Sequence, residues 1–283
     1  MLEWMARHAA LWPAALLLVW GGLLALAEAR WPRRPGTAQV RTRWPVNLGL
    51  YAAGAALLAS GLLQPLEQAA LQLGSRLGTH GIAGLPWPDA AKIALGVLAI
   101  DAVQYLLHRL SHAVPLLWRL HQVHHADVAM DVSTSVRHHP LEVAVLLLLT
   151  LVACAALGVP VVSLLLYLAL QVTHTVFCHA NLALPPRLDA ALRWVFVTPD
   201  MHRIHHSRIE AEGQRNFGMV LPWWDWLLRS YQAQPHEPHE RMGLGLDDAD
   251  PARDLGWWGS LALPLKRLGS AADTARAPKH KPD

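Results

Sequence analysis

Eight histidines of this 283-residue chain form three clusters with helical spacing. Within each cluster the later members stand three or four residues after the first, so that the side chains share one face of a helix. The clusters are His108 and His112, then His121, His124 and His125, and finally His202, His205 and His206. Neutral imidazole is a ligand for iron, copper, nickel and zinc. Eight such ligands exceed the coordination number of one ion, about four to six, and they predict a site for two ions, each with a position open for oxygen or substrate.

Other metal chemistries lack their sequence patterns in this chain. There is neither a His-Glu-x-x-His motif of zinc proteases nor the Glu-x-x-His pairs of carboxylate di-iron bundles. The two cysteines, Cys154 and Cys178, lie in apolar runs and indicate no disulfide framework, cysteine-bound zinc or iron–sulfur cluster. Imidazoles grouped without a metal would leave many polar atoms to satisfy, so metal binding is the favoured interpretation.

The residues around the clusters predict that separate helices carry them. Thr198 suits the N-cap, Pro199 the first helical position, and Asp200 the positive end of a helix dipole, so the third cluster opens a short helix. Pro115 interrupts the chain between the first and second clusters. The fold must therefore bring these helices together.

The composition is that of an integral membrane protein with sizeable aqueous segments. Hydrophobic residues make up 53% of the chain and charged residues only 16%, against about 25% in soluble proteins. This balance excludes a disordered chain and argues against an ordinary soluble enzyme. The net charge of +3, without a basic stripe interleaved with aromatic residues, gives no support to nucleic-acid binding.

Apolar runs indicate where the chain crosses the bilayer. A spanning helix needs about 20 mostly apolar residues. The runs are 9–27, 46–65, 90–107, 141–157 and 159–177, the last two joined by a turn at Gly158 and Pro160. Strand-like alternation is absent. We predict an all-α integral membrane helical bundle of four to five spans with a His-rich helical cap.

The distribution of arginines predicts how this bundle is oriented in the membrane. Segment 30–45 contains five arginines and no acidic residue, whereas the loop 66–89 has one arginine. The positive-inside rule places 30–45 in the cytoplasm, which would be the inner side of the inner membrane in a bacterium. Five spans then put 108–140 and 178–283, and with them all three clusters, on the cytoplasmic side.

Over residues 46–268 the sequence resembles the fatty acid hydroxylase / sterol desaturase superfamily of integral membrane di-iron oxygenases. The resemblance rests on spaced motifs that include the clusters. They are Asp101-x3-Tyr105-x2-His108-Arg109-x2-His112, Leu117-Trp118-Arg119-x-His121-x2-His124-His125, Arg137-His138-His139-Pro140-Leu141-Glu142, His179-Ala180-Asn181, Thr198-Pro199-Asp200-Met201-His202-x2-His205-His206-Ser207, Asn216-Phe217-Gly218 and Trp224-Asp225. One departure is Leu228-Arg229-Ser230, where a Phe-Gly-Thr-like ending is more typical of the family.

The resemblance implies two non-haem iron ions, O2, and hydroxylation or desaturation of an unactivated lipid C–H bond. It implies that the eight clustered histidines are iron ligands and that His179 is a ninth. The lipid would be a fatty acyl chain, a sterol or another isoprenoid lipid. Because the chain has no His-Pro-Gly-Gly haem segment, flavin fingerprint or iron–sulfur motif, we expect a separate cytoplasmic electron-transfer protein.

The resemblance also implies a domain division. We expect an N-terminal span and basic loop at 1–45 and the catalytic domain at 46–231. A C-terminal extension follows at 232–268, with an interfacial stretch in 255–268, and a disordered tail at 269–283.

Further polar residues are candidates for holding the ligands in place. Asp101, within a span and seven residues before His108, would accept a ring N–H of a ligand histidine or bond to another helix. The other candidates for such support, or for bracing the cap, are His139, Glu142, Asn181, Asn216 and Asp225. His174 is five residues, about 140°, from His179, so we expect a core position. Solvated positions are expected for His8, His80, His236, His239 and His280.

Two alternatives from other classes are a membrane protein that binds or transports metal without oxidation, and a zinc hydrolase. Transport predicts ionisable residues along a path through the bilayer, and among the spans only Asp101 qualifies. A hydrolase would need a carboxylate base paired with the clusters. Metal analysis combined with an oxygen-consumption assay separates the three.

Overall fold

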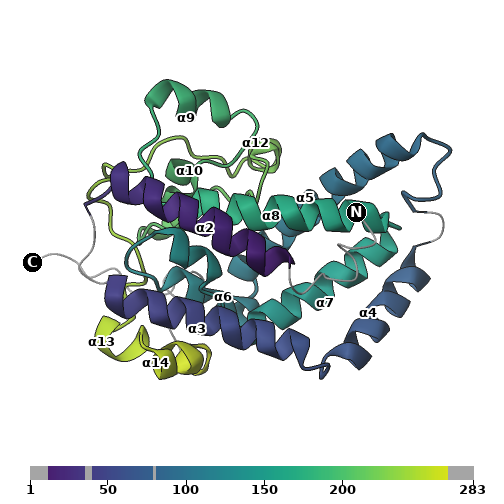
Figure 1. Cartoon of the computed structure of the whole chain (residues 1–283), viewed down its shortest axis with the longest axis horizontal. Helices are drawn as coiled ribbons and strands as arrows, with labels where there is room; N and C mark the ends of the chain where they lie inside the picture. The colour runs from purple at the N-terminus through teal and green to yellow at the C-terminus, as the bar shows by residue number, and fades with distance from the viewer. Residues whose placement is uncertain (1–11, 36–39, 79–80, 267–283) are drawn as a thin grey trace, which may run out of the picture.

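The computed structural model describes residues 12–35, 40–78 and 81–266. Within these ranges it contains helices and no strand, with isolated bridges between Pro32 and Leu182 and between Ser207 and Leu244 (Figure 1). The predicted all-α fold is confirmed. Outside the described residues lie the predicted disordered tail, 269–283, and the histidines His8, His80 and His280.

Three helices are long and apolar enough to cross a membrane: α2 (Trp12–Arg30), α5 (Asp89–Ala113) and α8 (Val161–His179). Helices α3 (Val40–Ala59) and α4 (Gln64–Leu77) meet the same criteria together, but a bend of 74° separates them, as in a broken span or a re-entrant segment. Helix α7 (Pro140–Ala156) is apolar and has 17 residues, at the lower limit of about 17–25 for a span. The described residues thus offer three to four candidate spans, where we expected four to five.

Helix α4 occupies part of the segment expected to be a loop. It packs against α7 through small residues, and a Cβ atom at Gly74 would lie only 2.5 Å from the backbone oxygen of Val152. Close approach at small residues is typical of helix pairs in membranes. The expectation of a loop is therefore wrong here, because the close packing of α4 on α7 is a long-range contact that the local sequence does not reveal.

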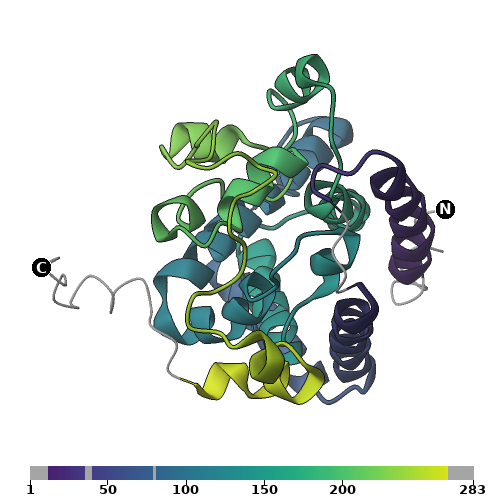
Figure 2. The same cartoon turned by 90° about the vertical axis from the view of Figure 1, so that its left-hand side faces the viewer.

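The long helices end or begin at a common cap. Helices α2, α5 and α8 end there, α3 and α7 begin there, and the turn at Gly158 joins α7 to α8 at the opposite end, as predicted. Figure 2 looks onto the cap end. The cap consists of α6 (Pro115–His125), η1 (Val132–Val136), α9 (Pro186–Leu192), α10 (Pro199–His205), α11 (Glu210–Gly213) and α12 (Trp223–Leu227).

Arginines of segment 30–45 tie the bundle to this cap. Arg33 forms an ion pair with Asp200 of α10, and Arg34 donates its backbone N–H to Asn181 Oδ1 at 3.0 Å. Arg43, in the first turn of α3, is buried and forms ion pairs with Asp127, at 2.6 Å, and with Asp131, at 2.7 Å. The basic segment and the histidine clusters therefore lie at the same end of the bundle.

The C-terminal extension also packs on the cap. It contains α13 (Pro251–Asp254), α14 (Trp257–Ala262) and η2 (Leu263–Leu265). Leu263 is fully buried against Leu50 and Val123, and its carbonyl accepts a hydrogen bond from Gln122 at 3.1 Å. The extension therefore contacts both α6 of the cap and α3 of the bundle. Trp258 and Leu265 are 79% and 84% exposed on its outer surface, and the interfacial position of this stretch stays a prediction.

Removing the Arg43 side chain should destabilise the fold strongly. Arg43→Ala leaves Asp127 and Asp131 buried without their cation, and we expect a loss of about 3–5 kcal/mol in the free energy of unfolding. Thermal unfolding in detergent measures the effect. The neighbouring Arg41 is exposed, so Arg41→Ala is the matched control and should change stability by less than about 0.5 kcal/mol. Equal, small effects of both variants would contradict the anchoring role.

Candidate metal centre

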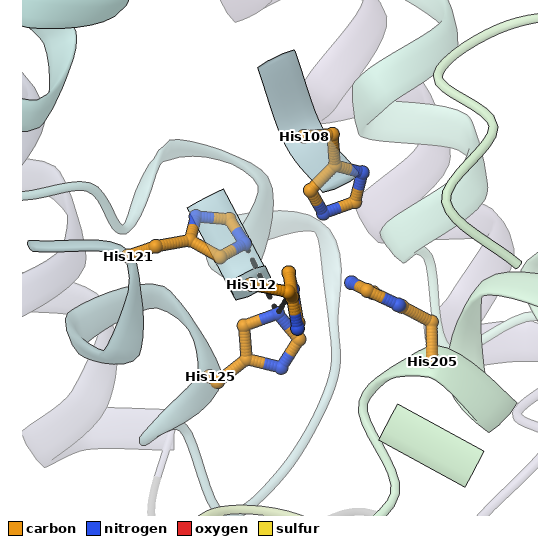
Figure 3. Close-up of side chains that lie close together, drawn as sticks. All are labelled: His108, His112, His121, His125 and His205. Carbon is orange, nitrogen blue, oxygen red and sulfur yellow. Dashed lines mark hydrogen bonds between the residues drawn. The ribbon is translucent and has the colours of Figure 1, made fainter. Parts of the chain in front are cut away.

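Nine imidazoles converge inside the cap in two adjacent groups. Each is at most 7% exposed. The five-histidine group contains His108, His112, His121, His125 and His205 (Figure 3). The four-histidine group contains His124, His179, His202 and His206. Within each group the ligand atoms lie within 4.8 Å of one another. The structure therefore brings together all nine histidines singled out in the sequence, from four helices.

Helices α6 and α10 contribute to both groups. On α6, His124 and His125 are neighbours in sequence and belong to different groups, and His205 and His206 do the same at the C-terminal end of α10. The N-terminus of α10 is built as predicted, with the Thr198 hydroxyl accepting from the Met201 N–H and Pro199 in the first turn. Helix α5 supplies His108 and His112 to the five-histidine group, and α8 supplies His179 to the four-histidine group.

Hydrogen bonds behind the rings determine which nitrogen faces inward. The Nδ1 atoms of His108 and His205 donate to the carbonyls of Phe217 and Arg215, both at 2.8 Å. His179 Nδ1 donates to the Thr175 carbonyl at 2.7 Å. Because a carbonyl oxygen only accepts, Nδ1 carries the proton in each ring and a neutral ring keeps its lone pair on Nε2. The inward nitrogens are thus prepared to bind a cation.

Inward-facing nitrogens approach one another closely. In the four-histidine group, His179 Nε2 lies 3.1 Å from His124 Nε2 and 3.0 Å from His202 Nε2. In the five-histidine group, His125 Nε2 lies 3.1 Å from His112 Nε2 and 3.2 Å from His121 Nε2. A proton on one of two facing nitrogens allows one hydrogen bond between that pair of rings. In each group, however, one nitrogen, the Nε2 of His179 or of His125, faces two others and cannot form a hydrogen bond with both through a single proton.

Several buried ring nitrogens have no hydrogen-bond partner among the described residues. Those that belong to the two groups are His112 Nδ1, His124 Nδ1, His202 Nδ1, His205 Nε2 and His206 Nε2. A buried polar atom without a partner costs about 1–3 kcal/mol. Cations bound between the rings would give partners to His205 Nε2 and His206 Nε2 and would remove the repulsion between facing lone pairs. The donor set therefore fits two metal ions that accept nitrogen ligands.

Electrostatics favour the neutral form of rings in both groups. Burial, reinforced by the positive charge that neighbouring rings would carry, lowers the pKa of His124, His125, His202 and His206 well below the ordinary value. Burial lowers the pKa of His205 to about 3. Neutral imidazole is the form that binds metal, so the centre does not depend on deprotonation near neutral pH.

Glu142 and His138 flank the centre as a pair. Glu142 accepts from His121 Nδ1 at 2.6 Å, in the supporting position expected for it. His138 Nδ1 lies 3.3 Å from the same carboxylate, and its ring stacks on His124 with centroids 4.5 Å apart. Burial disfavours protonated His138, but the Glu142 charge outweighs it and raises the pKa of His138. Sequence analysis assigned no role to His138, although its i, i+4 spacing to Glu142 was visible.

Asp101 bonds to other helices, which is the second of the two contacts expected for it. It accepts from the Tyr167 hydroxyl and the Trp224 indole N–H, both at 2.8 Å, and from the Leu221 N–H. No ligand histidine is among these donors, so the expectation that Asp101 holds a ligand ring is wrong. The physical reason is that the Nδ1 of His108, the ligand nearest on its helix face, is already bonded to the Phe217 carbonyl. Asp101 instead joins α5, α8 and α12.

Asp225 supports the centre through one intermediate peptide. Its carboxylate accepts from the backbone N–H groups of Phe217, at 2.8 Å, and Gly218, at 2.7 Å, and from the Ser230 hydroxyl, at 2.6 Å. The Phe217 carbonyl then receives His108. Asn216 fixes the same loop through Met201 and Gln232. Asp225 and Asn216 thus brace the loop that orients a predicted ligand.

Other candidate residues lie outside the two groups. Asn181 clamps Arg34 through both its amide atoms, and His139 Nδ1 accepts from the Leu141 N–H at the start of α7. His174 packs between Phe177 and Phe196 in the core, as expected. His236 is exposed, but His239 is only 5% exposed and lies 3.7 Å from Asp200. The expectation of a solvated His239 is wrong, because the loop before it folds back onto α10.

Arg229 occupies the position where the family pattern favours glycine. Its φ angle is +58°, in the left-handed region that glycine adopts at low cost. The adjoining Ser230 bonds to Asp225 and to the Tyr105 hydroxyl, so the turn is fixed by its neighbours. The departure noted in the sequence therefore places an arginine in a strained turn beside the loop that supports His108.

Comparisons with known proteins agree with this geometry. Residues 93–230 match the family model described as fatty acid hydroxylase, a segment that contains all nine histidines. No solved structure matches the chain significantly.

Characterised relatives include three lipid-modifying enzymes. Ornithine lipid hydroxylase OlsE of Rhizobium tropici is 30% identical over 193 residues, 68% of this chain and 56% of that protein. Human alkylglycerol monooxygenase is 26% identical over 57% of this chain and 34% of that enzyme. Methylsterol monooxygenase 2-2 of Arabidopsis thaliana is 29% identical over 58% of this chain and 62% of that enzyme. This chain therefore spans only about a third to three fifths of the length of these relatives.

Glycine at position 229 should relieve the strained turn. A left-handed backbone costs a non-glycine residue about 1–2 kcal/mol, so Arg229→Gly should be about 1 kcal/mol more stable than Arg229→Ala. The alanine variant is the matched control, since both substitutions remove the same side chain. Thermal unfolding of the two variants side by side in detergent decides the point. If glycine gives no advantage over alanine, the turn is not strained.

Proposed function

We propose, because this chain belongs to the fatty acid hydroxylase family, that it is a membrane-bound non-haem di-iron oxygenase that hydroxylates or desaturates an unactivated C–H bond of a lipid. The observation that carries the proposal is the pair of buried imidazole groups, whose inward nitrogens lie about 3 Å apart and lack enough protons to satisfy one another. The names of the relatives refer to an ornithine lipid, an alkylglycerol and a methylsterol, and we propose that the substrate is a lipid within this broad range.

The two groups have separate tasks in this proposal. The five-histidine group would hold one iron ion and the four-histidine group the other. When bound, the iron pair supplies the redox chemistry that turns O2 into an oxidant able to attack an unactivated C–H bond. The chain positions the ligands through Glu142 and the carbonyls behind the rings, and it buries all nine rings.

Either reaction requires electrons from outside the chain. Hydroxylation places one oxygen atom in the C–H bond and reduces the other to water, whereas desaturation removes two hydrogen atoms and reduces both oxygen atoms to water. Each consumes two electrons and two protons beyond those of the substrate. Because the sequence has no motif for haem, flavin or iron–sulfur clusters, we propose a separate electron-transfer protein that docks on the cap side.

We place the cap on the cytoplasmic side. Support comes from the arginines of segment 30–45, which obey the positive-inside rule, and from their contacts with the cap. The lipid would enter sideways from the bilayer and bring its reactive carbon beneath the cap. We also propose that 46–231 forms the catalytic domain and that 232–268 is an extension that braces it.

Metal analysis tests the centre directly. The purified protein should bind about two iron ions per chain, and His125→Ala and His179→Ala should each weaken a different position, so that about one ion is lost. His236→Ala, at an exposed site outside both groups, is the control and should retain full metal content. Zinc as the bound metal, without electron-dependent O2 uptake, would instead support the metal-transport or zinc-hydrolase alternative.

Lipid mass spectrometry tests the reaction. Lipids from cells with and without the intact gene should differ by the mass of one oxygen atom for hydroxylation, or of two hydrogen atoms for desaturation. His124→Ala removes a ligand of the four-histidine group and should abolish the difference, while His236→Ala should preserve it. Product at the wild-type level from the His124→Ala variant would show that the ligand assignment is incorrect.

A further inference from the structure

A small cleft opens from the surface of the cap to the five-histidine group. Its volume is about 150 Å³. Its inner wall includes His112, His125 and Trp118, and its outer rim includes Glu210, Asp247 and Asp248. We call it the acidic cleft. It connects solvent with two predicted iron ligands that are themselves only 7% and 4% exposed.

The inner wall offers nitrogen atoms without partners. His112 lines the acidic cleft, and neither its Nδ1 nor the Nε1 of Trp118 has a hydrogen-bond partner among the described residues. Because His112 Nε2 faces the five-histidine group, its Nδ1 is an N–H donor in the metal-bound form, as the indole Nε1 always is. Both donors suit the water molecules that a hydrated cation carries into the cleft. Since a water molecule occupies about 30 Å³, the cleft has room for a few waters.

Negative charge dominates the outer rim. Three carboxylates, those of Glu210, Asp247 and Asp248, are exposed there and face one guanidinium, that of Arg208. Arg208 lies 3.2 Å from Asp247, whose side chain is 70% exposed. Charges of one sign around a concave opening raise the local concentration of the opposite ion and speed its association. The rim is thus arranged to attract cations.

The acidic part of the rim is held in a defined position. Leu244 forms a bridge with Ser207, and the Gly243 carbonyl accepts from the Arg208 N–H at 2.9 Å. Met242 and Leu244 are buried against Met130. Gly245 has a φ angle of +94°, and a Cβ atom there would lie 3.2 Å from Val128 Cγ1. The turn that presents Asp247 and Asp248 is therefore anchored, and it lies outside the family match at 93–230.

We propose that the acidic cleft is the route by which divalent metal ions enter the centre, with Asp247, Asp248 and Glu210 as their transient outer ligands. This inference rests on the proposed metal centre. Carboxylate oxygens bind hydrated cations weakly and release them readily to imidazole nitrogens, which are stronger ligands for iron. A lipid is a poor fit to the cleft, because drug-sized ligands already need about 300–1,000 Å³. O2 is uncharged and gains nothing from the carboxylates.

The test measures the rate of metal uptake by metal-depleted protein in detergent. Co²⁺ is the probe, and the change in visible absorption on nitrogen coordination is followed by stopped flow. The double variant Asp247→Asn/Asp248→Asn should take up Co²⁺ about tenfold more slowly at low salt, with the final metal content unchanged. Added salt should slow the wild type more than this variant.

The matched control removes the same amount of charge elsewhere. Asp89→Asn/Glu237→Gln neutralises two exposed carboxylates away from the cleft and should load at the wild-type rate. Equal rates for the cleft variant and the wild type would overturn the proposal. So would an equally slow control, which would indicate net charge alone, or a reduced final metal content in the cleft variant, which would indicate damage to the centre.

An experiment that restores the negative charge distinguishes a change in the entry route from damage to the fold. The natural cysteines, Cys154 and Cys178, are buried, so Asp248→Cys offers one exposed thiol. A thiol reagent that adds a sulfonate should restore the uptake rate of this variant, and one that adds an ammonium should slow it further. Identical effects of both reagents would overturn the proposal.

The uptake experiment does not require lipid oxidation. If the wild type binds two ions with rates governed by the cleft but oxidises no lipid, the proposed function fails and the entry route stands. If lipid is oxidised and the cleft variant loads normally, the route fails and the function stands.

Discussion

Facing nitrogen atoms, held about 3 Å apart in a buried space, are the constraint on which the rest of this structure depends. Lone pairs at this separation repel, and neutral imidazoles without partners carry a desolvation cost. The protein keeps the rings in place from behind, through carbonyls of Phe217, Arg215 and Thr175 and through Glu142. Those supports are themselves supported, since Asp225 holds the Phe217 peptide. The positions of the rings are therefore fixed by two successive layers of hydrogen bonds within the cap.

The cap must also stay fixed on the bundle. Arg43 does this most directly, because it reaches from α3 to Asp127 and Asp131 in the chain segment between the second histidine cluster and α7. Arg137 extends the same buried network to Val123, Asn47 and Ser260, so that α6, α3 and α14 share one set of hydrogen bonds. The C-terminal extension thereby becomes part of the support for α6, although it lies beyond the segment matched by the family model.

The features that the sequence predicts correctly depend mostly on local patterns. The spacing within each histidine cluster predicts a shared helix face because helical geometry is local, and the Thr198 cap follows from its immediate neighbours. The division of the rings into two groups is set by contacts between helices far apart in sequence, and so are the contacts of Asp101, the burial of His239 and the ring stacking of His138. Helix α4 was missed for the same reason: the surface that it buries belongs to α7.

Adjacent residues of one helix, His124 and His125, belong to different groups, and His205 and His206 repeat this arrangement on α10. Any shift of either helix must therefore alter both ligand sets together. The spacing between the two ions would then be a property of the backbone of these two helices rather than of flexible side chains.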